Sequence, residues 1–342
     1  MGGKGKKERK EGIYNMTIEE IASMAGVSRT AVSRYLNNGY ISEEKKEKIS
    51  KIIKETGYQP SRQAQMLRTK KTKLIGVVLP KINSEAVSRI VAGISNILSK
   101  EGFQILLANT ENNVDKELEY LNLFKSNQVD GIIFIATILN KKHKEIFKNL
   151  KIPIIVVGQK VEEVSCIYHD DFNAAKELTE IMIKKGKRKI AYIGVTVKDK
   201  AAGLSRKNGY LDALKKNNIV VDESIMVEGD FSIESGYEKM KSFFEEKKRI
   251  DAVFCVTDSI AIGAMEYLKQ IDKIIPDEIS IVGVGHTKMS RVVSPKLTTV
   301  HYFYKTSGME AANMILALLR QQSFARKEMK LGYRIIEQQS TL

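Results

Sequence analysis

Two kinds of hydrophobic pattern divide the chain near residue 73. Before that point, apolar positions recur every three or four residues in three short stretches, which begin after Thr17, Ser28 and Ser42. This spacing predicts three short helices, and Ser or Thr in front of a helix is a favoured N-cap. Two helices joined by a tight turn, with a third in support, predict a helix-turn-helix unit over residues 16–60.

Beyond residue 73, apolar runs of strand length alternate with stretches of helical periodicity. The runs are LIGVVL, FQILLAN, GIIFIA, IPIIVVG, IAYIGV, AVFCV and ISIVGVG. Nearly continuous apolar strands separated by helices predict parallel sheets that are buried on both faces. About ten strands in residues 74–342 suit two doubly wound α/β lobes better than one sheet. Ligands of such lobes bind at the carboxyl ends of the strands, here in the cleft between the lobes.

The charge is concentrated at the amino-terminal end. The chain has a formal net charge of +15, and residues 1–73 hold 17 Lys and Arg against 8 Asp and Glu. A basic segment on a milder globular body points to a polyanion, with nucleic acid as the leading candidate. Residues 1–15, rich in Gly and Lys, are interpreted as a flexible basic tail.

The two cysteines, Cys166 and Cys255, lie in apolar runs and are expected to be buried thiols. This fits a reducing cytoplasm, where a DNA-binding protein would associate with the nucleoid. No apolar run reaches the length of a membrane-spanning helix, and no apolar segment follows the basic start as in a secretory signal. The sequence therefore predicts no membrane partner.

The stretch Thr17–Asn37 closely resembles the DNA-binding headpiece of the lactose/galactose-repressor (LacI/GalR) family. The matching residues are Ala22, Ala25-Gly26-Val27-Ser28, Val32-Ser33-Arg34 and Leu36-Asn37, followed by Thr56–Pro60 and the tail Gln339-Ser340-Thr341. Ser61 departs from the Asn that the family usually has after this proline. The connection 39–42 resembles the sucrose-repressor branch.

The resemblance implies an α-helical helix-turn-helix headpiece plus a two-lobed α/β core like that of periplasmic binding proteins. A hinge helix and linker would occupy residues 61–73. One lobe would comprise residues of about 74–172 and 303–331, and the other about 173–302 and 332–342. The family also implies a homodimer, and the lack of a leucine heptad after residue 320 favours a dimer over a tetramer.

The helix after Ser28 is expected to enter the major groove. Arg29 and Thr30 lie on its first turn, where Arg suits guanine and Thr suits several base edges. Ser33 and Arg34, one turn further, are expected to reach phosphate or a flanking base. The complete set of predicted DNA-binding residues is Thr17, Ser28, Arg29, Thr30, Ser33, Arg34, Asn37 and Tyr58, with Ser61, Ala64 and Leu67 in the hinge.

The hinge segment resembles a short helix that binds the minor groove. Leu67 would wedge a base step there and bend the duplex. So short a helix is unstable alone, so its formation would depend on DNA and on pairing within the dimer.

Six residues are predicted to bind a small effector. Arg206 matches the family's arginine that grips a sugar hydroxyl or phosphate. Thr257 and Asp258 stand where the family has Asn-Asp, although Asp258 is also a good helix N-cap. Lys81 and Gln159 each follow a predicted strand, and His286 lies where relatives often carry an acid.

Without that acid, a plain neutral hexose fits less well than an anionic sugar. Lys81 and Arg206 would form a cationic clamp for it. Residues 168–171 and 255–264 resemble the trehalose-repressor branch, which is associated with trehalose 6-phosphate. A sucrose-type disaccharide is the next candidate.

Enzyme signals are absent. The chain has no G-x-x-x-x-G-K-[ST], H-E-x-x-H, C-x-x-C or G-x-S-x-G motif. His169 beside Asp170 and Asp171 is interpreted as a polar strand end rather than a metal corner. We expect no catalytic residue, metal or cofactor.

The sequence thus predicts a repressor of a carbohydrate-utilisation operon. This repressor would bind double-stranded operator DNA, and a sugar or sugar phosphate would release it from the operator. Three alternatives stay open. They are a regulator whose ligand or protein partner strengthens DNA binding, a cytosolic sugar-binding protein without a DNA role, and an enzyme acting on phosphorylated sugars. The operator and the role of residues 1–15 stay open as well.

Overall fold

The computed structural model describes residues 16–37, 39–58, 71–126, 129–321 and 325–341. The chain forms two compact units, one before and one after the boundary between Thr72 and Lys73. The tail predicted for residues 1–15 and most of the predicted hinge, including Ser61, Ala64 and Leu67, lie outside the described residues.

The first unit is a bundle of three helices, α1 (Ile18–Met24), α2 (Arg29–Leu36) and α3 (Glu43–Thr56). The predicted capping box at Thr17 and Glu20 is confirmed, because each side chain bonds the other's backbone N–H. Ser28 caps α2, whereas Ser42 precedes α3 without a capping bond from its side chain. The core comprises Ile21, Ala22, Ala25, Ala31, Val32 and Ile49.

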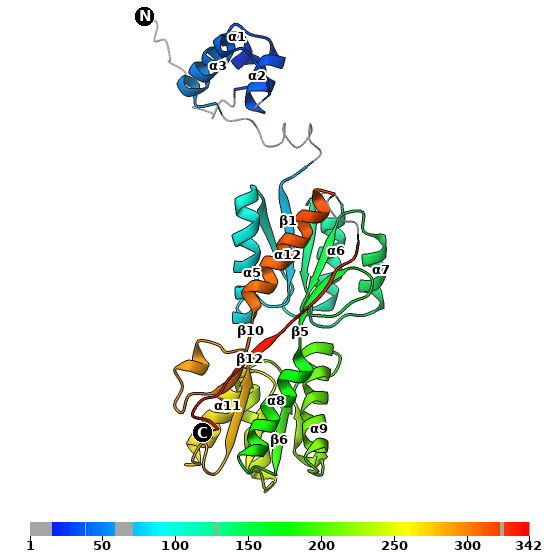
Figure 1. The fold of residues 1–342 in the computed structure, drawn as a ribbon, viewed down its shortest axis with the longest axis vertical. Helices are drawn as coiled ribbons and strands as arrows, with labels where there is room; N and C mark the ends of the chain where they lie inside the picture. Colours follow the sequence, from blue (N-terminus) through cyan, green and yellow to red (C-terminus); the bar gives the residue numbers. More distant parts are fainter. Residues whose placement is uncertain (1–15, 38, 59–70, 127–128, 322–324, 342) are drawn as a thin grey trace, which may run out of the picture. The chain divides into compact units, whose positions relative to one another are not determined.

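The second unit consists of two lobes, each built on a mainly parallel sheet of six strands within the described residues (Figure 1). The N-lobe sheet has the order β11-β5-β4-β3-β1-β2. Its strands are β1 (Leu74–Leu79), β2 (Gln104–Asn109), β3 (Gly131–Ile135), β4 (Ile154–Val157), β5 (Ser165–His169) and β11 (Glu328–Leu331). Its helices are α5 (Glu85–Leu98), α6 (Val114–Lys125), α7 (Lys141–Asn149) and α12 (Tyr304–Leu319), with the short η1 (Ser99–Glu101).

The C-lobe sheet has the order β12-β10-β9-β8-β6-β7. Its strands are β6 (Ile190–Gly194), β7 (Met226–Glu228), β8 (Ala252–Cys255), β9 (Ser280–Val284), β10 (Thr298–Tyr302) and β12 (Tyr333–Ile336). Its helices are α8 (Asp171–Lys184), α9 (Arg206–Lys216), α10 (Ile233–Glu245) and α11 (Asp258–Gln270), with the short η2 (Lys200–Ser205), η3 (Glu223–Ile225) and η4 (Met289–Arg291). The pair β10–β12 is antiparallel.

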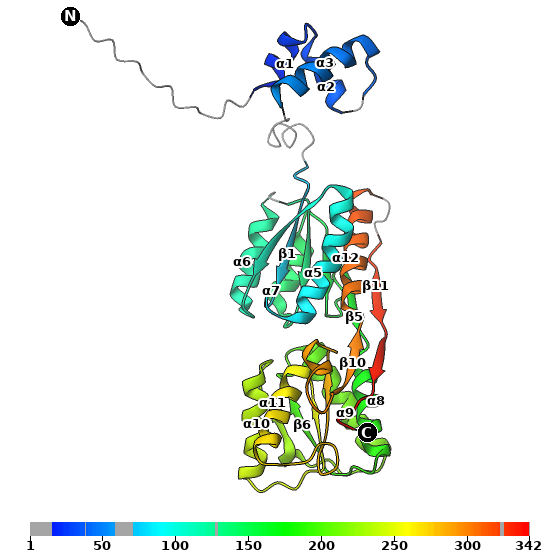
Figure 2. The same ribbon diagram turned by 90° about the vertical axis from the view of Figure 1, so that its left-hand side faces the viewer.

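The chain passes between the lobes three times, from β5 to α8, from β10 to α12 and from β11 to β12 (Figure 2). Each apolar run singled out in the sequence forms a strand. No run was singled out for five other strands. Three of them, β7, β11 and β12, are edge strands of three or four residues that carry little periodicity, and the other two, β5 and β10, mix polar with apolar residues. Segments distant in the sequence thus complete each sheet.

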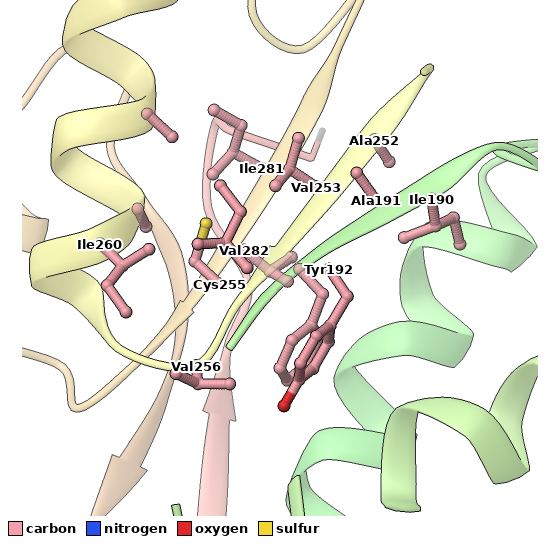
Figure 3. Close-up of a cluster of buried hydrophobic side chains, with 14 of the residues drawn as sticks. Ile190, Ala191, Tyr192, Ala252, Val253, Cys255, Val256, Ile260, Ile281 and Val282 are labelled. Carbon is pink, nitrogen blue, oxygen red and sulfur yellow. The ribbon is translucent and has the colours of Figure 1, made fainter. Parts of the chain in front are cut away.

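Each lobe has a dense apolar interior. In the C-lobe, Val253, Cys255 and Ile281 lie on one face of the sheet, and Tyr192 lies on the other, where its ring stacks on Phe254 (Figure 3). The prediction that both thiols are buried is confirmed, and burial raises the pKa of Cys166 and of Cys255. Among the described residues, no helix is both long and apolar enough to cross a bilayer.

Candidate functional site

The helix α2 has a buried and an exposed face. Ala31 and Val32 are buried, which fixes the helix on the bundle. Arg29, Thr30 and Arg34 are exposed, and Ser33 is half-buried. Because Arg29 and Ser33, and likewise Thr30 and Arg34, stand four residues apart, these side chains form two adjacent rows on the outer face. This face carries the polar side chains that the sequence predicts to meet DNA.

Arg29 already has a partner on the neighbouring helix. Its Nη1 atom lies 2.8 Å from Oε1 of Glu19, and both side chains are about two-thirds exposed, at 67% and 68%. So exposed an ion pair is weak, and it places a carboxylate beside the predicted base-reading arginine. The sequence reasoning missed Glu19, whose signal was an acidic residue in the first turn of α1.

The other predicted headpiece residues surround α2. Thr17 is the exposed N-cap of α1, and Asn37 is the C-cap of α2, with its side-chain amide bonded to the Ser33 carbonyl. Tyr58 packs partly against the headpiece core, and this burial raises its pKa. Thr17 and Asn37 therefore place polar atoms at the ends of α1 and α2.

In the second unit, both lobes line a cavity of about 500 Å³. Its walls are built from the segments that follow the carboxyl ends of β1, β3, β4 and β5 in the N-lobe and of β6, β8 and β9 in the C-lobe. The cavity contains five of the six residues predicted for the effector: Lys81, Gln159, Arg206, Thr257 and Asp258. Parallel strands explain this convergence, because their carboxyl ends meet at one edge of each sheet.

Arg206 is buried and held by two acceptors. Its Nε atom donates to Oδ1 of Asp171 at 2.7 Å, and Nη1 donates to the carbonyl of Val256. The guanidinium also lies 5.5 Å from the ring centre of Tyr302. Burial alone would lower the pKa of Arg206, but the Asp171 carboxylate together with Tyr302 and Tyr304 outweighs burial and raises the pKa. Among the described residues, Nη2 has no hydrogen-bond partner, so this end of the fork can serve a ligand.

Asp258 occupies the first turn of α11, while Thr257 is the N-cap and accepts a bond from Ile260 N–H at 3.3 Å. The capping role considered for Asp258 therefore belongs to Thr257. Asp258 instead accepts from Thr299 Oγ1 and from the N–H of Thr287, the latter at 2.7 Å. Burial raises the pKa of its carboxyl although these hydrogen bonds oppose the shift.

A polar bond crosses the cavity from one lobe to the other. Gln159 donates from Nε2 to Oδ1 of Asp199 at 2.8 Å, and both side chains are buried. Asp199 also accepts from the N–H groups of Ala201 and Ala202 at 3.0 Å each. Burial raises the pKa of Asp199. Asp199 was missed in the sequence, where its signal was a polar residue after the strand IAYIGV.

The structure does not bring His286 into the cavity. Its Nδ1 atom lies 3.0 Å from Nδ1 of His301, and its carbonyl accepts a bond from Arg89. Among the residues lining the cavity, the histidine is His169, at the end of β5. His169 packs against Tyr302 and Tyr304, its Nε2 is buried without a partner, and burial lowers its pKa to about 4.

The cavity is lined by more acidic than basic side chains, whereas the sequence predicts a clamp of two cations, Lys81 and Arg206. The three cations Lys81, Arg89 and Arg206 face the five acids Glu85, Asp171, Asp199, Glu234 and Asp258. Arg206 is paired with Asp171 and Arg89 with Glu85, whereas Lys81 has no carboxylate partner within the described part of the chain. Lys81 is therefore the cation most available to an anionic group. No group of three or more metal-ligating side chains is found among the described residues.

Comparisons with known proteins agree with this arrangement. Residues 17–61 match the family model "Bacterial regulatory proteins, lacI family", and residues 179–341 match the model "Periplasmic binding protein-like domain". The chain is 33% identical over 305 residues to the sucrose operon repressor of Staphylococcus xylosus, covering 89% of this chain and 94% of that protein.

It is also 30% identical over 329 residues to the transcriptional regulator RegA of Clostridium saccharobutylicum, covering 95% and 99% of the two chains. A solved structure of the Lac repressor dimer bound to operator has the same fold. It has a TM-score of 0.88 at 23% identity, covering 96% of this chain and 99% of that one. The chain therefore belongs to the lacI family of bacterial regulatory proteins, which are DNA-binding regulators of transcription and not enzymes.

Proposed function

We propose that this chain is a homodimeric repressor of a carbohydrate-utilisation operon, released from its operator by a sugar or sugar-phosphate effector. The observation that carries this proposal is the cavity, which buried polar groups of both lobes line. A ligand there contacts both lobes at once, so its binding favours one angle between them. The similarity to a sucrose operon repressor supports a carbohydrate as that ligand.

In this proposal α2 reads the operator. Arg29 and Thr30 contact base edges, while Ser33 and Arg34 contact phosphate or a flanking base. The helix is held on the DNA backbone by Thr17, Ser28, Asn37 and Tyr58. Ser61, Ala64 and Leu67 form the hinge that enters the minor groove. Two headpieces of a homodimer would then meet two half-sites of a pseudo-palindrome.

The effector is proposed to lie among Lys81, Gln159, Arg206, Thr257 and Asp258. Buried carboxylates accept hydrogen bonds from hydroxyls, and a guanidinium fork donates to hydroxyl or phosphate oxygens. These groups suit a polyhydroxylated ligand. Lys81, as the cation without a carboxylate partner, would meet a phosphate, so trehalose 6-phosphate comes first and a sucrose-type disaccharide second.

A thermal-shift panel on the full chain tests the effector. Trehalose 6-phosphate, sucrose 6-phosphate and the two free disaccharides are compared, with inorganic phosphate as the control. Stabilisation by a sugar phosphate that exceeds that of its free sugar, and that is lost in Lys81→Met, supports the proposal. Equal stabilisation by a sugar phosphate and its free sugar would show that Lys81 does not bind the phosphate. If none of these sugars stabilises the chain, a disaccharide or its phosphate is rejected as the effector.

Operator binding is tested separately by gel shift with promoter fragments and scrambled competitor at moderate salt. Release of a specific complex by the stabilising sugar supports a repressor that is induced. Tighter binding in the presence of that sugar would instead favour a co-repressed regulator. If the chain prefers no promoter fragment over the scrambled competitor, the result would favour a sugar-binding protein without a DNA role.

A further inference from the structure

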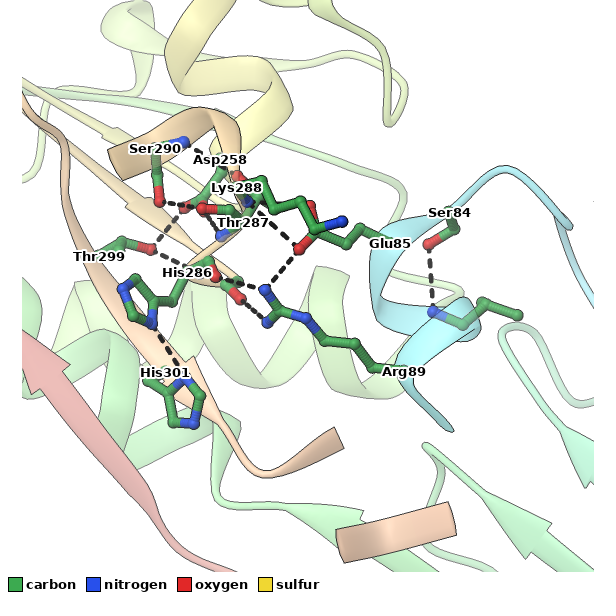
Figure 4. A network of polar contacts seen from close by, with 12 residues as sticks. Ser84, Glu85, Arg89, Asp258, His286, Thr287, Lys288, Ser290, Thr299 and His301 are labelled. Atoms are coloured by element: carbon green, nitrogen blue, oxygen red, sulfur yellow. Dashed lines mark hydrogen bonds and ion pairs between the residues drawn. The ribbon is translucent and has the colours of Figure 1, made fainter. Parts of the chain in front are cut away.

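Two side chains on one face of α5 hold a loop of the opposite lobe (Figure 4). Arg89 donates to the carbonyl of Gly285 at 3.3 Å and to that of His286 at 2.9 Å. Glu85 accepts from the N–H of Lys288, whose nitrogen lies 3.2 and 3.0 Å from the two carboxylate oxygens. Glu85 and Arg89 also pair with each other. The N-lobe thus grips the backbone of residues 285–288, the loop that follows β9.

The same loop is tied to the wall of the cavity. The N–H of Thr287 donates to Asp258 at 2.7 Å, and Thr299 donates from its hydroxyl to the other oxygen of that carboxylate. Thr287 and Asp258 both line the cavity. A group that binds Asp258 is therefore one hydrogen bond away from the loop that the N-lobe holds.

The loop has an uncommon backbone conformation. Gly285 has φ +139° and His286 has φ 46°, a left-handed conformation that residues other than glycine adopt infrequently. The side chains of Glu85 and Arg89 are each only 27% exposed, so water screens their charge-assisted bonds less than on an open surface. Opening of the lobes would break all the bonds from α5 and release a strained loop.

We propose that Glu85, Arg89 and loop 285–288 form a clasp that holds the two lobes closed and that a ligand at Asp258 strengthens it. Closure of the lobes by the clasp does not depend on the proposed function. Strengthening of the clasp by a ligand rests on the proposed function. Because residues of both lobes enclose the cavity, the closed state binds ligand more tightly, and by linkage a stronger clasp raises ligand affinity. The Gln159–Asp199 bond also spans the lobes, so loss of the clasp shifts the closed population rather than abolishing it.

The first test measures closure without any ligand. Nitroxide labels are placed on the full chain at Lys116→Cys in α6 and Glu238→Cys in α10, which are exposed positions in opposite lobes, while Cys166 and Cys255 are buried. Double electron–electron resonance then reports the distance between the lobes. We expect Arg89→Gln to move the distribution from short toward longer distances. Identical distributions in the parent and in Arg89→Gln would overturn the clasp.

A charge swap separates the clasp from a simple ion pair. The double variant Glu85→Arg with Arg89→Glu keeps the pair and the net charge of the cavity. It cannot restore the clasp, because an arginine at 85 cannot accept from Lys288 N–H and a glutamate at 89 cannot donate to the two carbonyls. We expect the swap to open the lobes as Arg89→Gln does. A parent-like distribution in the swap would contradict the proposal.

The matched control is Glu101→Gln, which removes a carboxylate paired with Arg320 within the N-lobe. It should leave the distance unchanged, and a shift equal to that of Arg89→Gln would also overturn the proposal. Trehalose 6-phosphate then serves as the ligand probe, with its apparent Kd expected to weaken by about tenfold in Arg89→Gln. If that probe fails to bind the parent, the proposed effector is rejected, while the distance measurement still decides the clasp.

Discussion

Asp171 accepts two hydrogen bonds on one carboxylate oxygen, from Arg206 Nε at 2.7 Å and from the Tyr302 hydroxyl at 2.9 Å. Asp171 begins α8, directly after the first passage between the lobes, and Tyr302 ends β10, directly before the second. The carboxylate therefore joins two of the three crossings. Arg206 connects this junction to the cavity, so a ligand bound to its guanidinium would act on two of the crossings between the lobes.

The Arg206–Asp171 pair should be strongly coupled. We expect Arg206→Gln to lower the free energy of unfolding of the body by about 3–5 kcal/mol, because it leaves a buried carboxylate without its cation. Adding Asp171→Asn should recover part of this loss, since both charges are then gone. Urea denaturation of the two single variants and the double variant measures the coupling. The exposed pair of Lys241 and Glu245 gives the control, where Lys241→Gln should cost less than about 1 kcal/mol. Additive effects in the first pair would contradict the coupling.

Arg29 should discriminate among bases rather than only bind phosphate. We expect Arg29→Ala to reduce the preference at one operator position by about 1–3 kcal/mol. Fluorescence anisotropy with single-base operator variants measures this, and Lys216→Ala, in the body, serves as the control. Equal weakening on every sequence would assign Arg29 to the phosphate backbone instead.

Glu19 should modulate Arg29 only slightly in the free protein. We expect Glu19→Ala to change the stability of the headpiece by less than about 1 kcal/mol, because the pair is exposed. It should tighten binding to all DNA sequences, since a negative charge beside the phosphates is removed. Binding isotherms at several salt concentrations test this, and weaker binding of all sequences would refute it.

Gly93 allows α5 and α12 to pack closely. A Cβ at this position would lie 2.1 Å from the carbonyl oxygen of Lys305, and one at Gly308 would lie 2.0 Å from that of Ile90. We expect Gly93→Ala to destabilise the body by about 1–3 kcal/mol or more, because the backbone of the partner helix must move. Gly332→Ala is the control, since its Cβ would meet nothing within 4 Å. Thermal denaturation of both variants measures the difference.

His169 should make the body sensitive to acid. Burial lowers its pKa in the folded state to about 4, below the ordinary value of 6.5. Stability is therefore complete above pH 6.5 and is lost as the pH falls toward 4, by about 3 kcal/mol at most, because the unfolded chain takes up the proton first. His169→Gln should flatten the pH dependence of the unfolding free energy between pH 7 and 4. An unchanged slope would show that His169 does not titrate in this way.

The sequence could predict elements whose signal is local. The capping box at Thr17 and Glu20 lies within four residues. The seven apolar runs predict strands because each consists almost entirely of apolar residues. Lys81, Gln159 and Thr257 could be placed at one cleft, because each follows a strand and parallel strands end at one edge. The arginine at 206 needed the family resemblance as well.

Contacts between segments distant in the sequence were decided by the tertiary structure alone. His286 follows a strand just as Gln159 does, but its loop turns at Gly285 and directs its ring to His301 and its carbonyl to Arg89. The pairing of Asp171 with Arg206 and the grip of Glu85 on Lys288 likewise join residues 35 and 203 positions apart. Local propensity and periodicity carry no information on such pairs. The pair of Asp171 and Arg206 arises only when α8 and α9 pack together within the C-lobe, and the bond of Glu85 to Lys288 arises only when the two lobes meet.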